Sequence, residues 1–262
     1  MTARAEPGWW VVAGQELRDL WLGGRGPVLI FGFSVLLSAV TYLAATNQVL
    51  NFLEQREAVN LVVQVTVAVG VLLALLVCAD AISGERERGT LENLLLTPVS
   101  RRAIVLGKLA AAQSLWLAAY LVSVPYVWVL GRGVSVVGRA LMLGLLAGTP
   151  LALGLAALGL LTSAFSASNR ISLAVSLFVL LALFAPTQLP TGPHGRFADV
   201  LLRLDPVASA LRYVTALLVT GHSWPGELSY LLSPLLTVVL AGGALVTTAN
   251  RIVNLNAGVS GR

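Results

Sequence analysis

The chain has 262 residues, of which 57% are hydrophobic and 11% are charged, and its mean hydropathy is +0.85. Soluble globular domains are far less apolar, so this composition requires a bilayer as solvent. The formal net charge is +5, but most arginines flank apolar runs, where they act as topology signals; we therefore expect no nucleic-acid binding. A single cysteine, Cys78, excludes an intrachain disulfide and a multi-cysteine metal site. Residues 1–7 are not followed by a long apolar core, so we expect no cleavable signal peptide.

Six apolar runs are long enough to cross a membrane, because a span takes about 20 residues. They cover residues 27–46, 59–80, 103–130, 140–165, 171–187 and 229–250. Backbone groups find no water partner in lipid, so each run must be a helix. The predicted fold class is an all-α membrane protein with six transmembrane helices, and residues 1–262 form one transmembrane domain.

Two further stretches are predicted to lie along the membrane rather than across it. Residues 9–22 combine three tryptophans with charges at helical spacing, which is typical of an interfacial helix. An outer segment, residues 188–228, starts with an irregular loop rich in proline and glycine. Asp205 and Pro206 then begin a helix, whose apolar stripe is Val207, Leu211, Val214 and Leu218. It is too short to span, so it either dips into the outer leaflet as a re-entrant helix or covers the outer end of a cavity.

The basic residues predict the orientation. With the N-terminus inside, eleven fall on the cytoplasmic side and six on the opposite side, which favours an N-in, C-in topology. The inner set is Arg4, Arg18, Arg25, Arg86, Arg88, Arg101, Arg102, Lys108, Arg170, Arg251 and Arg262, and the outer set is Arg56, Arg132, Arg139, Arg196, Arg203 and Arg212.

Charged residues are nearly absent from the spans. Lys108 lies about two turns into the third span, where its stem can snorkel to the surface, and Asp80 closes the second. The missing mid-membrane charge argues against a proton-coupled carrier. Neutral polar residues remain, and we expect them mainly to bond neighbouring helices rather than to line a path; they are Ser34, Ser38, Thr41, Gln64, Thr66, Gln113, Ser114, Ser172 and Ser176.

The fourth span has small residues at four-residue steps: Gly144, Gly148, Ala152 and Ala156. This spacing lets helices approach closely, and we expect it to serve packing within the chain before dimerisation. Pro150 is expected to kink this helix.

No catalytic or metal site is predicted. His194 and His222 are the two histidines, and neither has a glutamate or cysteine at helical ligand spacing. The serine-rich stretch 163–168 has no neighbouring acid or histidine and is interpreted as a turn. Gly84 and Gly89 mimic the spacing of a phosphate loop, but Thr90 stands where that loop needs lysine. We therefore expect no enzyme activity, no metal and no nucleotide site in this chain.

Residues 83–98, between the second and third spans, contain the densest charge cluster of the sequence. Glu85 and Glu87 alternate with Arg86 and Arg88, and Glu92 follows four residues after Arg88. A solvated topogenic loop would need the arginines but not three glutamates, because acidic residues contribute little to orientation. Thr90 can cap a short helix with an apolar face, ended by Thr97-Pro98. We interpret this turn as a docking surface for a soluble partner.

The same segment resembles a known family. The run Glu85-Arg86-Glu87-Arg88-Gly89-Thr90-Leu91-Glu92, followed by Leu95, Thr97-Pro98-Val99-Ser100 and Leu106-Gly107-Lys108, is similar to the hallmark of type-2 ATP-binding-cassette (ABC) transporter permeases. Six spans, an interfacial helix and an outer insertion extend the similarity over nearly the whole chain. It is closest to small permeases of drug export and of multicopper-enzyme maturation, and does not separate the two.

The resemblance implies an exporter subunit in the cytoplasmic membrane of a prokaryote, paired with a second permease, identical or related. It implies a separate ATPase, which binds ATP and Mg²⁺ and docks on the loop between spans two and three. The coupling residues would be Glu85, Arg86, Glu87, Arg88, Gly89, Thr90 and Glu92. The turn Ser166–Arg170 falls where a second cytoplasmic contact is expected.

Two other hypotheses remain open from the residues themselves. A non-transporting membrane anchor or sensor that recruits a cytosolic partner suits the scarcity of polar residues in the spans. An ion-independent carrier or small channel predicts solute flux through this chain alone.

Overall fold

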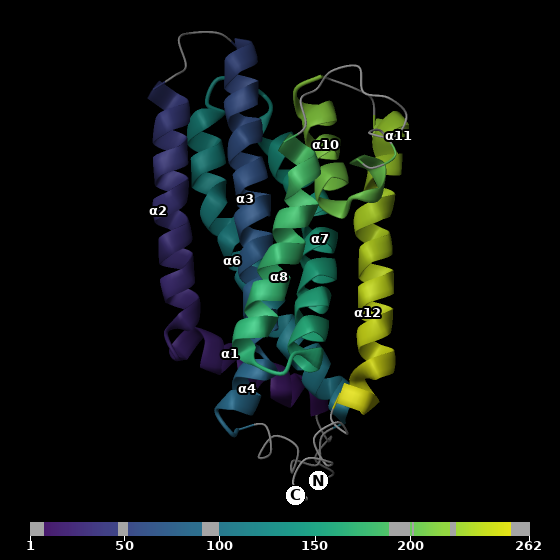
Figure 1. The fold of residues 1–262 in the computed structure, drawn as a ribbon. Coiled ribbons are helices and arrows are strands. Elements are labelled where there is room, and N and C mark those ends of the chain that lie inside the picture. The colour runs from purple at the N-terminus through teal and green to yellow at the C-terminus, as the bar shows by residue number, and fades with distance from the viewer. Residues whose placement is uncertain are drawn as a thin grey trace, which may run out of the picture.

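The computed structural model describes residues 8–46, 52–90, 100–188, 200, 202–220 and 224–252, and within them it is a helical bundle without a strand (Figure 1). Among these described residues, six helices are long and apolar enough to cross a membrane. They are α2 (Arg25–Thr46), α3 (Phe52–Asp80), α6 (Arg101–Leu130), α7 (Val137–Phe165), α8 (Asn169–Phe184) with the 3-10 turn η1 (Ala185–Gln188), and α12 (Leu232–Ile252). The predicted all-α, six-span fold is confirmed. Five of the predicted spans lie within these helices, and the sixth, 229–250, begins three residues before α12.

Shorter helices lie at both ends of the bundle. At one end are α1 (Gly8–Leu22), which packs against α6 and α2, and α4 (Ser83–Glu87). At the other end are α10 (Pro206–Leu218) and α11 (Trp224–Glu227), followed by the 3-10 turn η2 (Leu228–Leu231). We call the first of these the α4 end.

Helix α3 begins seven residues before the predicted apolar run, because polar residues extend it past the hydrophobic stretch. Gln55 explains part of this extension. Its side-chain Nε2 donates to the carbonyl oxygens of Leu130, at 2.8 Å, and Arg132, at 2.9 Å. Carbonyls at a helix C-terminus lack partners within their own helix, so Gln55 satisfies the end of α6.

Three helices form the centre of the bundle. In the most apolar stretch of α3, α6 and α7, 56% of residues are buried, against 11% in α2, 17% in α8 and 22% in α12. The peripheral helices therefore turn most of their apolar surface outward, as helices in contact with lipid do.

Trp116 of α6 fills the space between these central helices and is fully buried. A Cβ placed on Gly148 of α7 would lie 2.5 Å from its ring, and one on Gly70 of α3 would lie 2.7 Å from it. The ring nitrogen donates to Thr149 Oγ1 at 3.3 Å. The two glycines thus make room for one large side chain.

The small residues of α7 serve packing within the chain, as predicted. A Cβ on Gly144 would lie 2.9 Å from the Val63 side chain of α3, and Ala152 and Ala156 are fully buried. This face is covered by the chain itself, so it is not available for a second copy.

Most of the neutral polar residues bond neighbouring helices, as expected. Ser34 and Ser38 of α2 bond the Tyr126 hydroxyl of α6 at 2.9 and 3.0 Å, and Gln64 of α3 donates to Thr215 of α10 at 2.9 Å. The remaining such pairs are Trp21 with Ser114, Ser172 with the Ala79 carbonyl, and Ser176 with Thr162. The side-chain atoms Thr41 Oγ1 and Gln113 Nε2 are buried and find no hydrogen-bond partner in the part of the chain that the structure describes.

The predicted helix after Asp205 is α10. Asp205 Oδ1 accepts from the backbone N–H groups of Val207, at 2.8 Å, and Ala208, at 2.9 Å, so it caps the helix as expected. The predicted stripe Val207, Leu211, Val214 and Leu218 is buried. Burial raises the pKa of the Asp205 carboxyl, although the Ala208 and Val207 N–H groups act to lower it.

Candidate functional site

Helix α4 follows α3 after a two-residue turn and ends in a glycine motif. Gly89 has a φ of +71°, a left-handed conformation that glycine adopts without a Cβ clash. The N–H of Gly89 donates to the Arg86 carbonyl at 3.2 Å, and the N–H of Thr90 donates to the Glu85 carbonyl at 3.0 Å. This pair of bonds is a Schellman motif, which satisfies the last carbonyls of a helix. The helix predicted after Thr90 falls on residues 91–99, which lie outside the described residues.

On one side, a buried lysine ties α4 to α1 and α6. Lys108 Nζ donates to Glu85 Oε1 at 2.5 Å and to Glu16 Oε1 at 2.7 Å, and the lysine side chain is 2% exposed. The prediction that Lys108 snorkels to the surface is wrong. Carboxylates from α1 and α4 come to the ammonium instead, because a buried charge is stable only when paired.

On the opposite side, α4 is bonded to the turn between α7 and α8. Arg86 donates through Nη1 to the Ser166 carbonyl at 2.6 Å and through Nη2 to the Ala164 carbonyl at 3.1 Å. Glu87 Oε1 accepts from the backbone N–H of Asn169 at 2.8 Å. A cation therefore meets the C-terminal end of α7 and a carboxylate meets the N-terminal end of α8, each favourable with the helix dipole.

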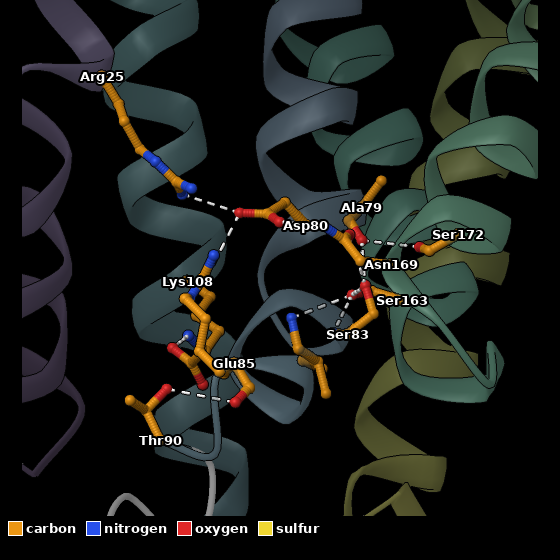
Figure 2. A network of polar contacts seen from close by, with 12 residues as sticks. Arg25, Ala79, Asp80, Ser83, Glu85, Thr90, Lys108, Ser163, Asn169 and Ser172 are labelled. Atoms are coloured by element: carbon orange, nitrogen blue, oxygen red, sulfur yellow. Dashed lines mark hydrogen bonds and ion pairs between the residues drawn. The ribbon is translucent and has the colours of Figure 1, made fainter.

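The junction of α3 and α4 is fixed by a buried serine cluster (Figure 2). Ser163 Oγ of α7 accepts from the backbone N–H groups of Ile82, at 3.0 Å, and Ser83, at 2.9 Å. Ser83 Oγ lies 2.9 Å from the Ala79 carbonyl and 3.0 Å from Asn169 Oδ1. These bonds satisfy backbone groups that the break between the two helices leaves free. Stretch 163–168 is thus partly helix, and its turn is limited to residues 166–168.

Asp80, the last residue of α3, connects this helix to α2 and α8. Its carboxylate accepts from Arg25 Nη1 of α2 at 2.8 Å and from Asn169 Nδ2 at 2.6 Å, and it lies 3.7 Å from Arg88 Nη2 (Figure 2). Asp80 and Asn169 together link α2, α3 and α8 at the α4 end.

The predicted site residues separate into two groups. Glu85 and Arg86 are half-buried and face partners within the chain, whereas Glu87, Arg88, Gly89 and Thr90 are exposed. Arg170 is exposed on the first turn of α8, and Glu92 lies outside the described residues. Glu87 and Arg88, although exposed, also have partners within the bundle.

Sequence reasoning missed the partners of α4. Glu16, Asn169 and Ser163 stand far from it in the chain, and no local pattern marks them. Asp80 and Lys108 gave a weak signal, because each is a charge at or inside the end of a span. In the part of the chain that the structure describes, no group of three or more His, Cys, Asp or Glu could hold a metal ion.

Six spanning helices define a multi-pass integral membrane protein whose α4 end is bonded into the bundle through a short charged helix. The family model described as ABC-2 family transporter protein matches residues 10–249. The chain belongs to this family and is a membrane permease of an ABC transporter, a transport component rather than a catalytic one. Permeases of this family generally work with an ABC ATPase, often as dimers. The comparison with curated proteins gave no match.

Proposed function

We propose that this chain is the permease subunit of an ABC exporter in the cytoplasmic membrane of a prokaryote. A separate ATPase, which binds ATP and Mg²⁺, docks on residues 83–98 and drives alternating access in a pair of permeases. The observation that carries the proposal is the bonding of α4, which is tied on one side to α6 and on the other to the α7–α8 turn.

This bonding supports force transmission through α4. Its inward charges, Glu85 and Arg86, have partners within the bundle. A force on the exposed surface at Arg88–Thr90 therefore cannot move α4 without also moving those partners. It displaces α6 through Lys108 and the α7–α8 turn through Arg86. Residues 83–90 therefore both attach α4 to the bundle and contact the ATPase.

The polar character of the spans supports an apolar or amphipathic substrate. The neutral polar side chains described above are mostly used between helices, and the buried lysine is neutralised by two carboxylates. Little charge then remains to bind a strongly charged solute within the bundle.

The proposal is tested with the full chain and the ABC ATPase that co-purifies with it, reconstituted in proteoliposomes. We expect the double variant Arg86→Gln, Glu87→Gln to assemble with the ATPase but to lose most of the permease-dependent stimulation of ATP hydrolysis. Arg139→Gln, an exposed cation on α7 near its other end, is the control. Unchanged stimulation in an assembled double variant would contradict the coupling role of α4.

A second measurement separates a transporter from a membrane anchor. We expect ATP hydrolysis by the complex to rise when an amphipathic substrate is added, with vectorial movement of that substrate. An ATPase that binds the permease but responds to no substrate would favour the anchor.

A further inference from the structure

A charged cavity of about 470 Å³ lies among α1, α2, α3, α4 and α6 at the α4 end. Its size falls in the range of small-molecule sites, roughly 300–1,000 Å³. Three cations line it: Arg25, Arg88 and Lys108. Four carboxylates also line it: Glu16, Asp19, Asp80 and Glu85. Four anionic against three cationic groups give this lining a small formal excess of negative charge.

An apolar groove of about 570 Å³ continues from this cavity between α2 and α3. The two share Leu20, Arg25, Val77 and Asp80, and the groove is otherwise lined mainly by apolar side chains such as Val28 and Leu76. Val28 is 70% exposed on α2, the least buried of the spanning helices, so the groove opens to the surface that faces lipid. A charged chamber joined to an apolar groove at the membrane edge matches the shape of an amphiphile.

The polar atoms of the cavity indicate what its charged end lacks. Glu85 Oε2 is buried and has no hydrogen-bond partner among the described residues, while Oε1 is bonded to Lys108. A buried acceptor without a partner is costly, so the missing group is a donor. Asp19 has no ion pair among the described residues, which adds a second carboxylate open to a cation.

The anion-binding capacity lies nearer the groove. Arg25 lines both the cavity and the groove, and it uses only Nη1 on Asp80 among the described residues. A guanidinium has five N–H donors and binds phosphate well. Arg88 adds a second guanidinium, 3.7 Å from the same Asp80.

We propose that the joined cavity and groove bind a phospholipid with a primary ammonium headgroup, such as phosphatidylethanolamine, taken from the leaflet at the α4 end. The ammonium bonds Glu85 Oε2 and Asp19, the phosphate lies against Arg25 and Arg88, and the acyl chains follow the groove between α2 and α3. Glu85 and Asp19 lie in the chamber, whereas Arg25 lies at its junction with the groove, together with the Asp80 carboxylate that it pairs with. The order of the two chamber carboxylates, Arg25 and the apolar groove matches the order of ammonium, phosphate and acyl chain in such a lipid.

Other headgroups fit less well. A quaternary choline ammonium has no N–H to give Glu85. None of the described residues that line the cavity is aromatic, so they form no cation–π cage around such a headgroup. An anionic headgroup without an amine brings no cation to Glu85 and Asp19, and it adds a further negative charge to a lining that already has four carboxylates. The proposal goes beyond the transport role, and it concerns the permease alone, without an ATPase.

The test is a titration of the purified full chain in detergent with dioleoyl-phosphatidylethanolamine, -phosphatidylcholine and -phosphatidylglycerol, with bound lipid counted by native mass spectrometry. We expect the ethanolamine lipid to bind at least about tenfold more tightly than the other two, because its N–H groups bond a buried charged acceptor. Glu85→Gln should weaken ethanolamine-lipid binding by about the same factor.

Two exposed variants keep the test decisive if Glu85→Gln fails to fold, since Asp19→Asn and Arg25→Gln change side chains at the surface of the bundle. We expect Asp19→Asn to narrow the preference over the choline lipid, and Arg25→Gln to weaken binding of all three lipids. Glu57→Gln, an exposed carboxylate near the opposite end of α3, is the matched control. Equal affinity for the three lipids, a preference for phosphatidylglycerol, or variants that bind like Glu57→Gln would overturn the proposal.

Discussion

Lys108 brings a charge into a spanning helix and neutralises it with two carboxylates from other elements. Such a cluster contributes less to net stability than its close contacts suggest, because burying the ions costs free energy. Its main effect is to specify one arrangement of helices, because Lys108 can pair with both carboxylates only when α1, α4 and α6 meet in this way.

Removing the lysine should therefore be severe. We expect Lys108→Met to destabilise the fold by roughly 3–5 kcal/mol, since two half-buried carboxylates lose their shared cation. The midpoint of thermal unfolding in detergent checks this. Arg102→Met, an exposed cation on the same helix, is the control and should change the midpoint little. A triple variant that adds Glu16→Gln and Glu85→Gln should recover part of the loss; equal midpoints for Lys108→Met and Arg102→Met would refute the role of the cluster.

Gly148 is required by the Trp116 ring rather than by its own backbone. A Cβ there would lie 2.5 Å from the ring, so we expect Gly148→Ala to destabilise the bundle by about 1–3 kcal/mol through overpacking. Gly138→Ala, on the same helix with open space around its Cβ, should be neutral or stabilising. Adding Trp116→Phe should restore part of the thermal midpoint of Gly148→Ala. If Gly148→Ala melts like Gly138→Ala, the close approach is absent.

At the scale of elements, α4 depends on the left-handed glycine at its end. Gly89→Ala places a Cβ in open space, so its cost is conformational only, roughly 1–2 kcal/mol. We expect the backbone amides at positions 89 and 90 to exchange hydrogen roughly 5- to 30-fold faster in this variant than in the wild type, with little change elsewhere. Gly89→Asn, which tolerates this conformation better, should exchange at a rate between the two. Unaltered exchange in Gly89→Ala would argue against the Schellman motif.

Helix α10 depends on its cap in a comparable way. Asp205→Ala should cost about 1 kcal/mol of stability, whereas Asp205→Asn keeps an accepting oxygen for Val207 and Ala208. Burial raises the folded pKa of Asp205 above its unfolded value, so its contribution is most favourable below the unfolded pKa and is lost as pH rises through the folded pKa. Asp205→Asn should lack this pH dependence. The thermal unfolding midpoint of this variant should therefore rise relative to that of the wild type as pH increases from acid to neutral. A constant difference between the two proteins would contradict the pKa shift.

Elements were easier to predict from the sequence than their connections. The six spans follow from apolar length, and the capped start of α10 follows from Asp205-Pro206 with its stripe. The link from Glu85 through Lys108 to Glu16 could not be predicted, because it joins residues 23 and 92 positions apart that share no periodicity. The same holds for Arg86, whose partners are backbone carbonyls rather than a recognisable side chain.

For the whole molecule, the central question is which end of the bundle faces the cytoplasm. The excess of basic residues predicts that the α4 end does. We expect Thr90→Cys to react with a membrane-impermeant maleimide in intact cells only after permeabilisation, and Ser135→Cys, exposed in the turn between α6 and α7, to react without it. The native Cys78 is fully buried and gives little background. The reverse labelling pattern would place the charged turn outside and refute the coupling proposal.

Trp116 also limits how this protein can move. One rigid ring occupies the space left by glycines on both α3 and α7. Sliding α3 by one turn, 5.4 Å, would bring Thr66 or Ala74 against that ring in place of Gly70, and sliding α7 by one turn in one direction would bring Ala152 there in place of Gly148. We therefore expect the three central helices to move as a single rigid block. In the alternating access that we propose, the opening then occurs where this block meets α2, α8 and α12. Distances between probes placed across those three contacts should change during the transport cycle, and the distance between two probes within the block should stay constant.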